Sequence, residues 1–314
     1  MADKIKIATR DAYGNALAEL GDKYDFVVLD ADLSAATKTG VFKKKFPERH
    51  FNCGIAEGNM MSVAAGIAAT GRIPFVSTFA MFAAGRGFEQ IRNSIGYPHL
   101  NVKIAATHAG ISVGEDGATH QCLEDLALMR TIPGMTVINP ADAVEARAAV
   151  EAAINFEGPC YMRFGRPAIP VLFDKDYHFE IGKGVQMTEG RDVTIVATGL
   201  MVDLALTAAE LLKAEGISAR VINIHTIKPL DKELILTAAR ETGAIVTAEE
   251  HNIIGALGSA VTEAVCEGCP VPVVRVGIED QFGRSGTVPA LLERYGLTAQ
   301  NLVEKAKLAV ALKK

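Results

Sequence analysis

Short apolar runs alternate with helical patterns along most of the chain. In the first half, the runs that have the length and residue types of buried strands lie at residues 26–29, 73–77, 102–106, 136–138 and 161–164. Between them, Ala12, Ala16, Leu17 and Leu20 fall on one helical face, as do Val144, Ala148 and Ala152 later in the chain. This alternation predicts βαβ units, in which crossover helices cover a mostly parallel sheet.

The pattern is interrupted once. Residues 171–190 are polar and rich in glycine, which predicts a connecting segment. A second α/β series follows, with strand-like runs at residues 193–197, 220–224, 244–248 and 271–276. The fold class is therefore expected to be α/β, with two three-layer α/β/α domains at residues 1–170 and 191–314.

Composition narrows the classes of partner. The net charge of -5 argues against nucleic acid, because duplex binders present a basic face to the phosphates. The longest apolar stretch, residues 60–70, is too short for a membrane span, which needs about 20 residues. The charged start, MADKIK, does not resemble a signal peptide, so we expect a cytoplasmic protein.

The five cysteines are an odd number scattered along the chain, which does not indicate a disulfide framework. Cys266 and Cys269 have redox-motif spacing, but they are expected to close a helix. A reactive thiolate is usually stabilised at a helix N-terminus instead, so we expect a structural role for this pair.

Candidate chemistry gathers where the strands of the first half end. In open parallel sheets, ligands bind beyond the carboxyl ends of the strands. The side chains expected there are Asp30, Asp32, Glu57, Phe79, Phe82, His108, His120 and Arg163. Polar loops alone would explain the acids, but they explain less well the aromatic and imidazole rings in the same set.

Common signatures are missing from the sequence. It contains no G-x-G-x-x-G at a strand-to-helix turn and no G-x-x-x-x-G-K-[ST], which argues against nicotinamide and ATP sites. It also lacks G-x-S-x-G, and its seven histidines are dispersed, so neither a serine hydrolase nor a zinc site is indicated.

One set of motifs is more specific. GIAEGNMM at residues 54–61, STFAMF at 77–82, TH at 107–108 and GEDGATHQ at 114–121 occur in the order found in transketolases. IHTIKPLD at 224–231 and EEHN at 249–252 continue the match into the second half. The chain thus resembles the pyrimidine-binding and C-terminal domains of transketolase-type thiamine diphosphate enzymes over nearly all of its length.

The resemblance also shows what the sequence lacks. The diphosphate-binding domain of this family carries Gly-Asp-Gly and a distant Asn that hold Mg²⁺, and neither is present here in context. The similarity therefore implies a split enzyme, in which an N-terminal transketolase subunit ligates Mg²⁺ and the diphosphate. Because the family places its cofactor between subunits, an α2β2 assembly is expected.

The resemblance assigns roles to the cofactor-binding residues. Glu57 matches the acid that hydrogen-bonds a ring nitrogen of the aminopyrimidine. Phe79 and Phe82 match the aromatics that hold this ring, although core packing would also explain them. Asp32 matches an acid near the thiazolium, although a loop cap would account for it equally.

Other matches concern the substrate. Asp116 and His120 resemble the residues that recognise hydroxyls of the donor sugar and assist proton transfer. Arg10, His108 and Arg163 match positions that bind the phosphate of a sugar phosphate. Ala36 stands where a serine commonly helps to hold this phosphate, which is a departure from the family pattern.

The implied reaction is transfer of a two-carbon ketol group between a ketose phosphate and an aldose phosphate. Two alternatives within the superfamily are deoxyxylulose-phosphate synthase and the β chain of a 2-oxoacid dehydrogenase. The former is normally one long chain, and the latter lacks the GEDGATHQ loop. A third alternative is a non-catalytic subunit that kept the fold, and the sequence does not name the sugars.

Overall fold

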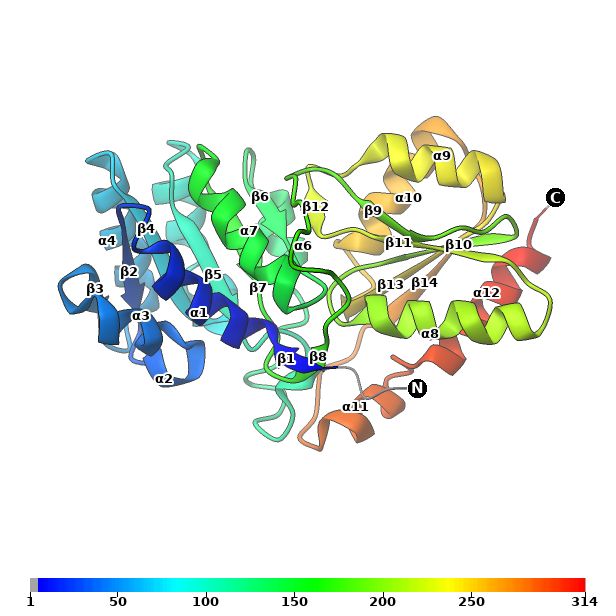
Figure 1. Ribbon diagram of the computed structural model, residues 1–314, viewed down its shortest axis with the longest axis horizontal. Coiled ribbons are helices and arrows are strands. Elements are labelled where there is room, and N and C mark those ends of the chain that lie inside the picture. Colours follow the sequence, from blue (N-terminus) through cyan, green and yellow to red (C-terminus); the bar gives the residue numbers. More distant parts are fainter. Residues whose placement is uncertain (1–4, 314) are drawn as a thin grey trace.

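The computed structural model describes residues 5–313, and it contains two α/β halves side by side (Figure 1). The charged start at residues 1–4, which entered the expectation about localisation, lies outside them. Residues 6–8 form a short strand, β1 (Lys6–Ala8), directly before the first helix. Among residues 5–313, no helix is long and apolar enough to cross a membrane.

The first half is built on a seven-stranded sheet. Its strands, in spatial order, are β12 (Thr226–Lys228), β6 (Thr136–Ile138), β7 (Cys160–Arg163), β5 (Lys103–Thr107), β4 (Ile73–Phe79), β2 (Phe26–Asp30) and β3 (His50–Asn52). All neighbouring pairs are parallel except β12 and β6. The βαβ rhythm of the sequence therefore predicted five of these strands correctly, namely β2, β4, β5, β6 and β7.

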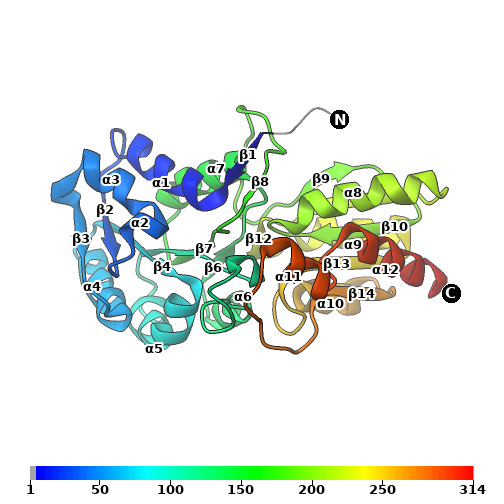
Figure 2. The same ribbon diagram turned by 90° about the horizontal axis from the view of Figure 1, so that it is seen from below.

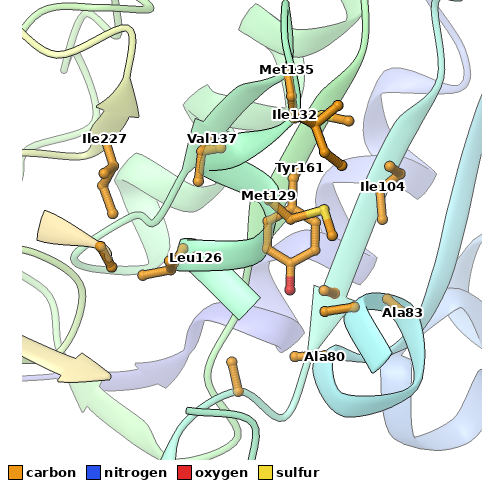
Figure 3. Packing of buried hydrophobic residues seen from close by; sticks show 14 of the residues in the cluster. Ala80, Ala83, Ile104, Leu126, Met129, Ile132, Met135, Val137, Tyr161 and Ile227 are labelled. Carbon is orange, nitrogen blue, oxygen red and sulfur yellow. The ribbon is translucent and has the colours of Figure 1, made fainter. Parts of the chain in front are cut away.

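Helices cover both faces of this sheet. On one face lie α1 (Thr9–Leu20), α3 (Thr39–Lys45) and α7 (Ala143–Asn155). On the other lie α4 (Glu57–Ala69), the π-helical turn η2 (Met81–Arg86) and α6 (Asp125–Thr131). Figure 3 shows Leu126 and Met129 of α6 packed near Tyr161 of β7 and Ala80.

The buried face of α7 is rotated slightly about the helix axis from the face that the sequence pattern indicated. Val144, Ala148 and Ala152 are only half-buried, whereas the fully buried positions include Ala146, Ala149, Val150 and Ala153. The small side chains make this helix apolar on most sides, so periodicity did not separate the two faces.

The second half contains a five-stranded sheet. Its order is β14 (Val273–Ile278), β13 (Ile245–Asn252), β10 (Val193–Ala197), β11 (Ala219–Asn223) and β9 (Val185–Thr188). Only β9 runs antiparallel to its neighbour. Figure 1 shows α8 (Met201–Ala214) and α12 (Ala299–Ala311) on one side, with α9 (Lys232–Thr242) and α10 (Leu257–Gly268) on the other.

The second half of the chain contributes one strand to the sheet of the first half. Strand β12 belongs to the second half of the chain, yet it extends the first sheet by pairing with β6. Ile227 of β12 thus packs on Val137 within a core that continues from one half into the other (Figure 3). The predicted domain boundaries, at residues 170 and 191, stay a prediction. The β12–β6 pair and the shared core connect the two predicted domains.

The connecting segment is more ordered than its composition indicated. Its backbone N–H groups at Leu172 and Phe173 donate to the Asp142 carboxylate at 2.6 and 2.9 Å. Strand β9, at the end of the segment, is an edge strand whose side chains are largely half-buried. Such a strand shows no apolar run, which explains why the sequence pattern missed it.

Candidate active site

The candidate residues lie at the carboxyl edge of the first sheet, but they do not all meet. Phe79 ends β4, His108 follows β5, and Glu57 is the first residue of α4. The turn η2 follows Phe79 and carries Phe82. Because π-helical turns often occur at functional sites, this turn is a second, independent indication of the same place.

Four rings form the centre of the site. Phe79 stacks on His108 with ring centroids 3.9 Å apart, and it stacks on Phe82 at 5.7 Å. His120 meets the edge of Phe82 at 5.4 Å. The sequence-predicted aromatics and imidazoles therefore form one connected cluster rather than separate core contacts.

An acid lies at the Phe82 end of this cluster. Glu57 is buried, with 4% of its side chain exposed, and its Oε1 lies 3.4 Å from Arg86 Nη1. The same guanidinium lies over the Phe82 ring at 4.6 Å from the centroid. A carboxyl group and an aromatic face are thus close enough to contact one small heteroaromatic ring together.

A cationic group lies at the opposite end. Arg10 Nη1 donates to His108 Nε2 at 2.8 Å and to the Ala36 carbonyl oxygen at 3.2 Å. Because an arginine only donates, His108 Nε2 must be the acceptor, and His108 Nδ1–H then donates to Thr107 Oγ1 at 2.9 Å. Burial, together with the positive charges of Arg10 and Arg166, lowers the pKa of His108 to about 3. His108 is therefore neutral at physiological pH.

The structure also shows where Asp32 lies. Its carboxylate accepts from Asn52 Nδ2 at 2.9 Å, and its backbone N–H donates to Asn52 Oδ1 at 3.1 Å. The preceding Asp30 is fully buried and accepts hydrogen bonds from Thr37 and Thr39, which anchors the segment after β2. Asp32 remains exposed at the edge of the sheet, outside the ring cluster.

Asp116 and His120 belong to one loop, residues 111–121. Asp116 is exposed, and His120 is half-buried with its Nδ1 2.9 Å from Thr119 Oγ1. The structure brings His120 to the phenylalanines, whereas Asp116 lies towards solvent.

Arg163 is placed differently from the expectation. It is 3% exposed, and its Nε donates to the Asp125 carboxylate at 2.9 Å. Its Nη2 donates to the carbonyl oxygens of Glu250 and Cys122 at 2.9 and 3.4 Å. Burial favours the neutral form, but Asp125 and Glu250 outweigh it and raise the pKa of Arg163. In this structure Arg163 joins the two halves, and its role towards a substrate phosphate stays a prediction.

Sequence reasoning missed Arg166, which is the arginine that joins the cationic group. It is half-buried, donates to the Val113 carbonyl oxygen and contacts Glu115 at 3.3 Å. Its charge lowers the pKa values of both Arg10 and His108, after the effect of burial. The sequence did offer one indication of Arg166 as a site residue, namely its position in the loop at the carboxyl end of β7, three residues beyond Arg163.

Metal sites and disulfides are absent from the part of the chain that the structure describes. Within residues 5–313, no group of three or more His, Cys, Asp or Glu side chains could hold a metal ion. All five cysteines are free thiols. Helix α10 ends at Gly268, so Cys266 and Cys269 lie at a helix C-terminus, as expected.

Comparison with known families assigns the chain to a class of protein. Residues 5–171 match the family model "Transketolase, pyrimidine binding domain", and residues 182–302 match "Transketolase, C-terminal domain". The chain therefore belongs to the transketolase family, which confirms the resemblance of its motifs. Within this family it corresponds to the C-terminal section, which comprises these two domains.

Individual relatives agree with this assignment. The chain is 49% identical to "Putative transketolase C-terminal section" of Methanocaldococcus jannaschii over 94% of each chain. It is 46% identical to "6-deoxy-6-sulfo-D-fructose transketolase subunit SqwH" of Clostridium sp., covering 95% of this chain and 92% of that protein. It covers 49% of rat transketolase, at 42% identity.

Solved structures confirm the fold. One is described as "Split gene transketolase, inactive beta4 tetramer"; it superimposes with a TM-score of 0.91 at 57% identity, over 98% of this chain and 99% of that one. Transketolase from Campylobacter jejuni gives a TM-score of 0.80 at 26% identity, over 95% of this chain and 46% of that one.

The first prediction separates a structural from a phosphate-binding role of Arg163. Arg163→Met leaves the buried Asp125 carboxylate without its partner, so the free energy of unfolding should fall by about 3–5 kcal/mol. Arg147→Met is the matched control, because its pairs with Glu19 and Glu151 are at the surface and should contribute only about 0–1 kcal/mol. Urea unfolding measures both, and equal losses would contradict the assignment.

The second prediction concerns the neutral His108. Its folded pKa of about 3 lies below the unfolded value of 6.5, so only the unfolded chain takes up this proton between these pH values. Stability should therefore fall as the pH decreases from about 6.5, relative to His108→Gln, by up to about 1.4 kcal/mol per pH unit. Urea unfolding of both proteins from pH 5 to pH 8 tests this. Parallel curves would show that His108 has the same pKa in the folded and the unfolded protein, which would contradict the prediction.

Proposed function

We propose that this chain is the C-terminal subunit of a split transketolase. With a separate N-terminal subunit, it transfers a two-carbon ketol group between a ketose phosphate and an aldose phosphate by means of thiamine diphosphate. One observation carries the proposal. A continuous row of contacts runs from the acid Glu57, through Arg86, Phe82 and Phe79, to His108 and Arg10.

The row has the chemistry that the cofactor and the substrate require. Its acidic and aromatic end suits an aminopyrimidine ring, which needs a hydrogen-bond partner and a stacking surface. Its cationic end suits the phosphate of a sugar, which Arg10 and Arg166 can bind with several N–H groups. The residues present therefore fit thiamine diphosphate, which supplies a carbon nucleophile and an electron sink when it is bound.

The residues of this chain would then divide the work. Glu57 holds a proton at a ring nitrogen of the pyrimidine, and Phe79 and Phe82 fix the orientation of that ring. His120 moves a proton at a hydroxyl of the donor sugar, and Asp116 hydrogen-bonds the sugar when it arrives. His108, as the Nδ1–H tautomer, orients Arg10 towards the phosphate. In this proposal, Asp32 lies near the thiazolium ring of the bound cofactor.

A partner chain completes the cofactor site in this proposal. The partner would supply the oxygen ligands of Mg²⁺ and bind the diphosphate. Two relatives support this division. One is named a transketolase C-terminal section, and another, from Phocaeicola vulgatus and 38% identical, is named as one subunit of an apulose-4-phosphate transketolase. An α2β2 heterotetramer in the cytoplasm is the assembly that we propose.

The sugar is the open part of the proposal. Pentose phosphates such as xylulose 5-phosphate and ribose 5-phosphate are the first candidates, which would place the enzyme in the pentose phosphate pathway. Similar relatives are named for a sulfonated ketose and for apulose 4-phosphate, and these are the next candidates. Ala36 offers only its carbonyl group, to Arg10, where a serine would also offer a hydroxyl to the phosphate.

The third prediction tests the catalytic role of Glu57 in the reconstituted pair. Glu57→Gln keeps the shape of the side chain but cannot exchange a proton, so turnover of xylulose 5-phosphate with ribose 5-phosphate should fall about 100-fold or more. Glu89→Gln, an exposed acid after the same turn, is the control and should leave turnover unchanged.

Three results would contradict the proposed function. They are full activity of Glu57→Gln, pyruvate decarboxylation in place of ketol transfer, and cofactor binding by the pair without any turnover of the candidate ketoses. The second would favour the dehydrogenase or synthase alternative. The third would favour a non-catalytic subunit.

The fourth prediction concerns Arg166, in the loop after β7. Arg166→Met should raise KM for xylulose 5-phosphate about 10- to 100-fold, because a charge-assisted hydrogen bond to the phosphate is lost. Unphosphorylated xylulose is the control substrate, and its kcat/KM should change little. An equal loss with both sugars would mean that Arg166 acts on the loop and not on the phosphate.

A further inference from the structure

The loop of residues 111–121, which carries Asp116 and His120, lies against the second half of the chain. Figures 1 and 2 show the segment before α11 (Val288–Arg294) passing beside it. Gln121, the residue after His120, makes the central contact between the two. Its Nε2 lies 3.2, 3.1 and 2.8 Å from the carbonyl oxygens of Ile111, Gly114 and Arg284. The buried amide of Gln121 thus connects the start of the loop, at Ile111 and Gly114, to Arg284 of the second half.

The segment around Arg284 fits the loop closely. Ser285 Oγ donates to the carbonyl oxygen of Glu115 at 2.6 Å, directly before Asp116 in the chain. Gly283 packs on the Gln121 side chain so tightly that a Cβ atom there would lie 1.8 Å from Gln121 Oε1. Residues 283–285 therefore leave the loop little freedom at Asp116.

The other end of the loop is also held by the second half. The Glu250 carboxylate accepts the backbone N–H of Ser112 at 2.6 Å. The same carboxylate packs on Gly110, where a Cβ atom would lie 2.2 Å from it. Gly110 has a φ of +77°, a conformation that favours glycine. The loop is thus fixed at both ends by residues that lie more than 120 positions later in the sequence.

We propose that Gln121 and Ser285 are positioning residues, through which the C-terminal domain sets Asp116 and His120 against the donor sugar. This inference rests on the proposed function. The Phe79 and Phe82 rings belong to the first sheet and its turn, so the cofactor ring is held separately. The C-terminal domain therefore acts on donor recognition and not on cofactor binding. Small displacements at such groups strongly reduce rates, because productive geometry is narrow.

The experiment uses the reconstituted pair and the fold-change in kcat/KM for the ketose phosphate. Ser285→Ala removes one exposed hydrogen bond and should lower kcat/KM about 5-fold. Gln121→Met removes the shared amide and should lower it about 10-fold or more. Ser285→Thr keeps the hydroxyl and should restore most of the activity. The dissociation constant of thiamine diphosphate should stay within about twofold in all of them, which a general loss of structure would not allow.

Two further variants sharpen the test. Gly283→Ala changes only the C-terminal domain, yet it should reproduce the Gln121→Met defect by displacing that side chain. In combination with Gln121→Ala it should add little, because the side chain that it displaces is gone. Thr207→Ala is the matched control, since this exposed hydroxyl also donates to a single carbonyl oxygen, within α8, and should have no effect.

Hydrogen–deuterium exchange of the amides in residues 111–121 gives a readout that does not need turnover. Exchange there should be faster in Ser285→Ala and Gly283→Ala than in the wild type and in Thr207→Ala. Unchanged exchange and unchanged kcat/KM in these two variants would overturn the inference. If the wild-type pair transfers no ketol group, the proposed function fails, and the exchange data alone decide whether the C-terminal domain holds the loop.

Discussion

The rest of the structure depends on the buried ion pair between Arg163 and Asp125. A buried guanidinium must have its charge balanced and its donors used, since a single unpaired charge costs several kcal/mol. Arg163 ends β7, Asp125 begins α6, and the Glu250 carbonyl group that completes the coordination belongs to β13. Three segments that are far apart in sequence therefore keep one relative position, and none can shift without exposing a charge to an apolar interior.

This constraint connects the C-terminal domain to the loop of residues 111–121. Glu250 makes two contacts at the junction between the two halves. Its carbonyl group accepts a hydrogen bond from Arg163, and its carboxylate accepts one from the backbone N–H of Ser112. Burial raises the pKa of that carboxyl group to about 7, and Arg163 limits the rise. The loop that presents His120 to Phe82 begins at this same junction. Strand β12 and the shared core add apolar area to the junction, so the two halves behave as one support for the loop.

Much of the fold was predictable, because buried parallel strands are continuous apolar runs that can be recognised without tertiary information. Glu57, Phe79 and His108 were predictable from motifs, and the structure places them in one row. Strands β9 and β12 were missed because they are short edge strands whose partners are distant in sequence. The position of Arg163 at a strand end was clear from the sequence, whereas the direction of its side chain depends on Asp125, which the sequence pattern does not show.

The contrast between Arg163 and Arg166 gives a physical criterion for separating structural from functional charge. Arg163 is buried, and neighbouring acids compensate it, so it has little left to offer a ligand. Arg166 stays half-exposed beside Arg10, and each like charge disfavours the other. The neutral His108 between strand end and guanidinium accepts from Arg10 without cancelling its charge. Arg10 and Arg166 repel each other even though Glu115 contacts Arg166, and an anion would relieve that repulsion when it binds. In the proposed site, Arg10 and Arg166 are therefore better candidates for the substrate phosphate than the buried, paired Arg163.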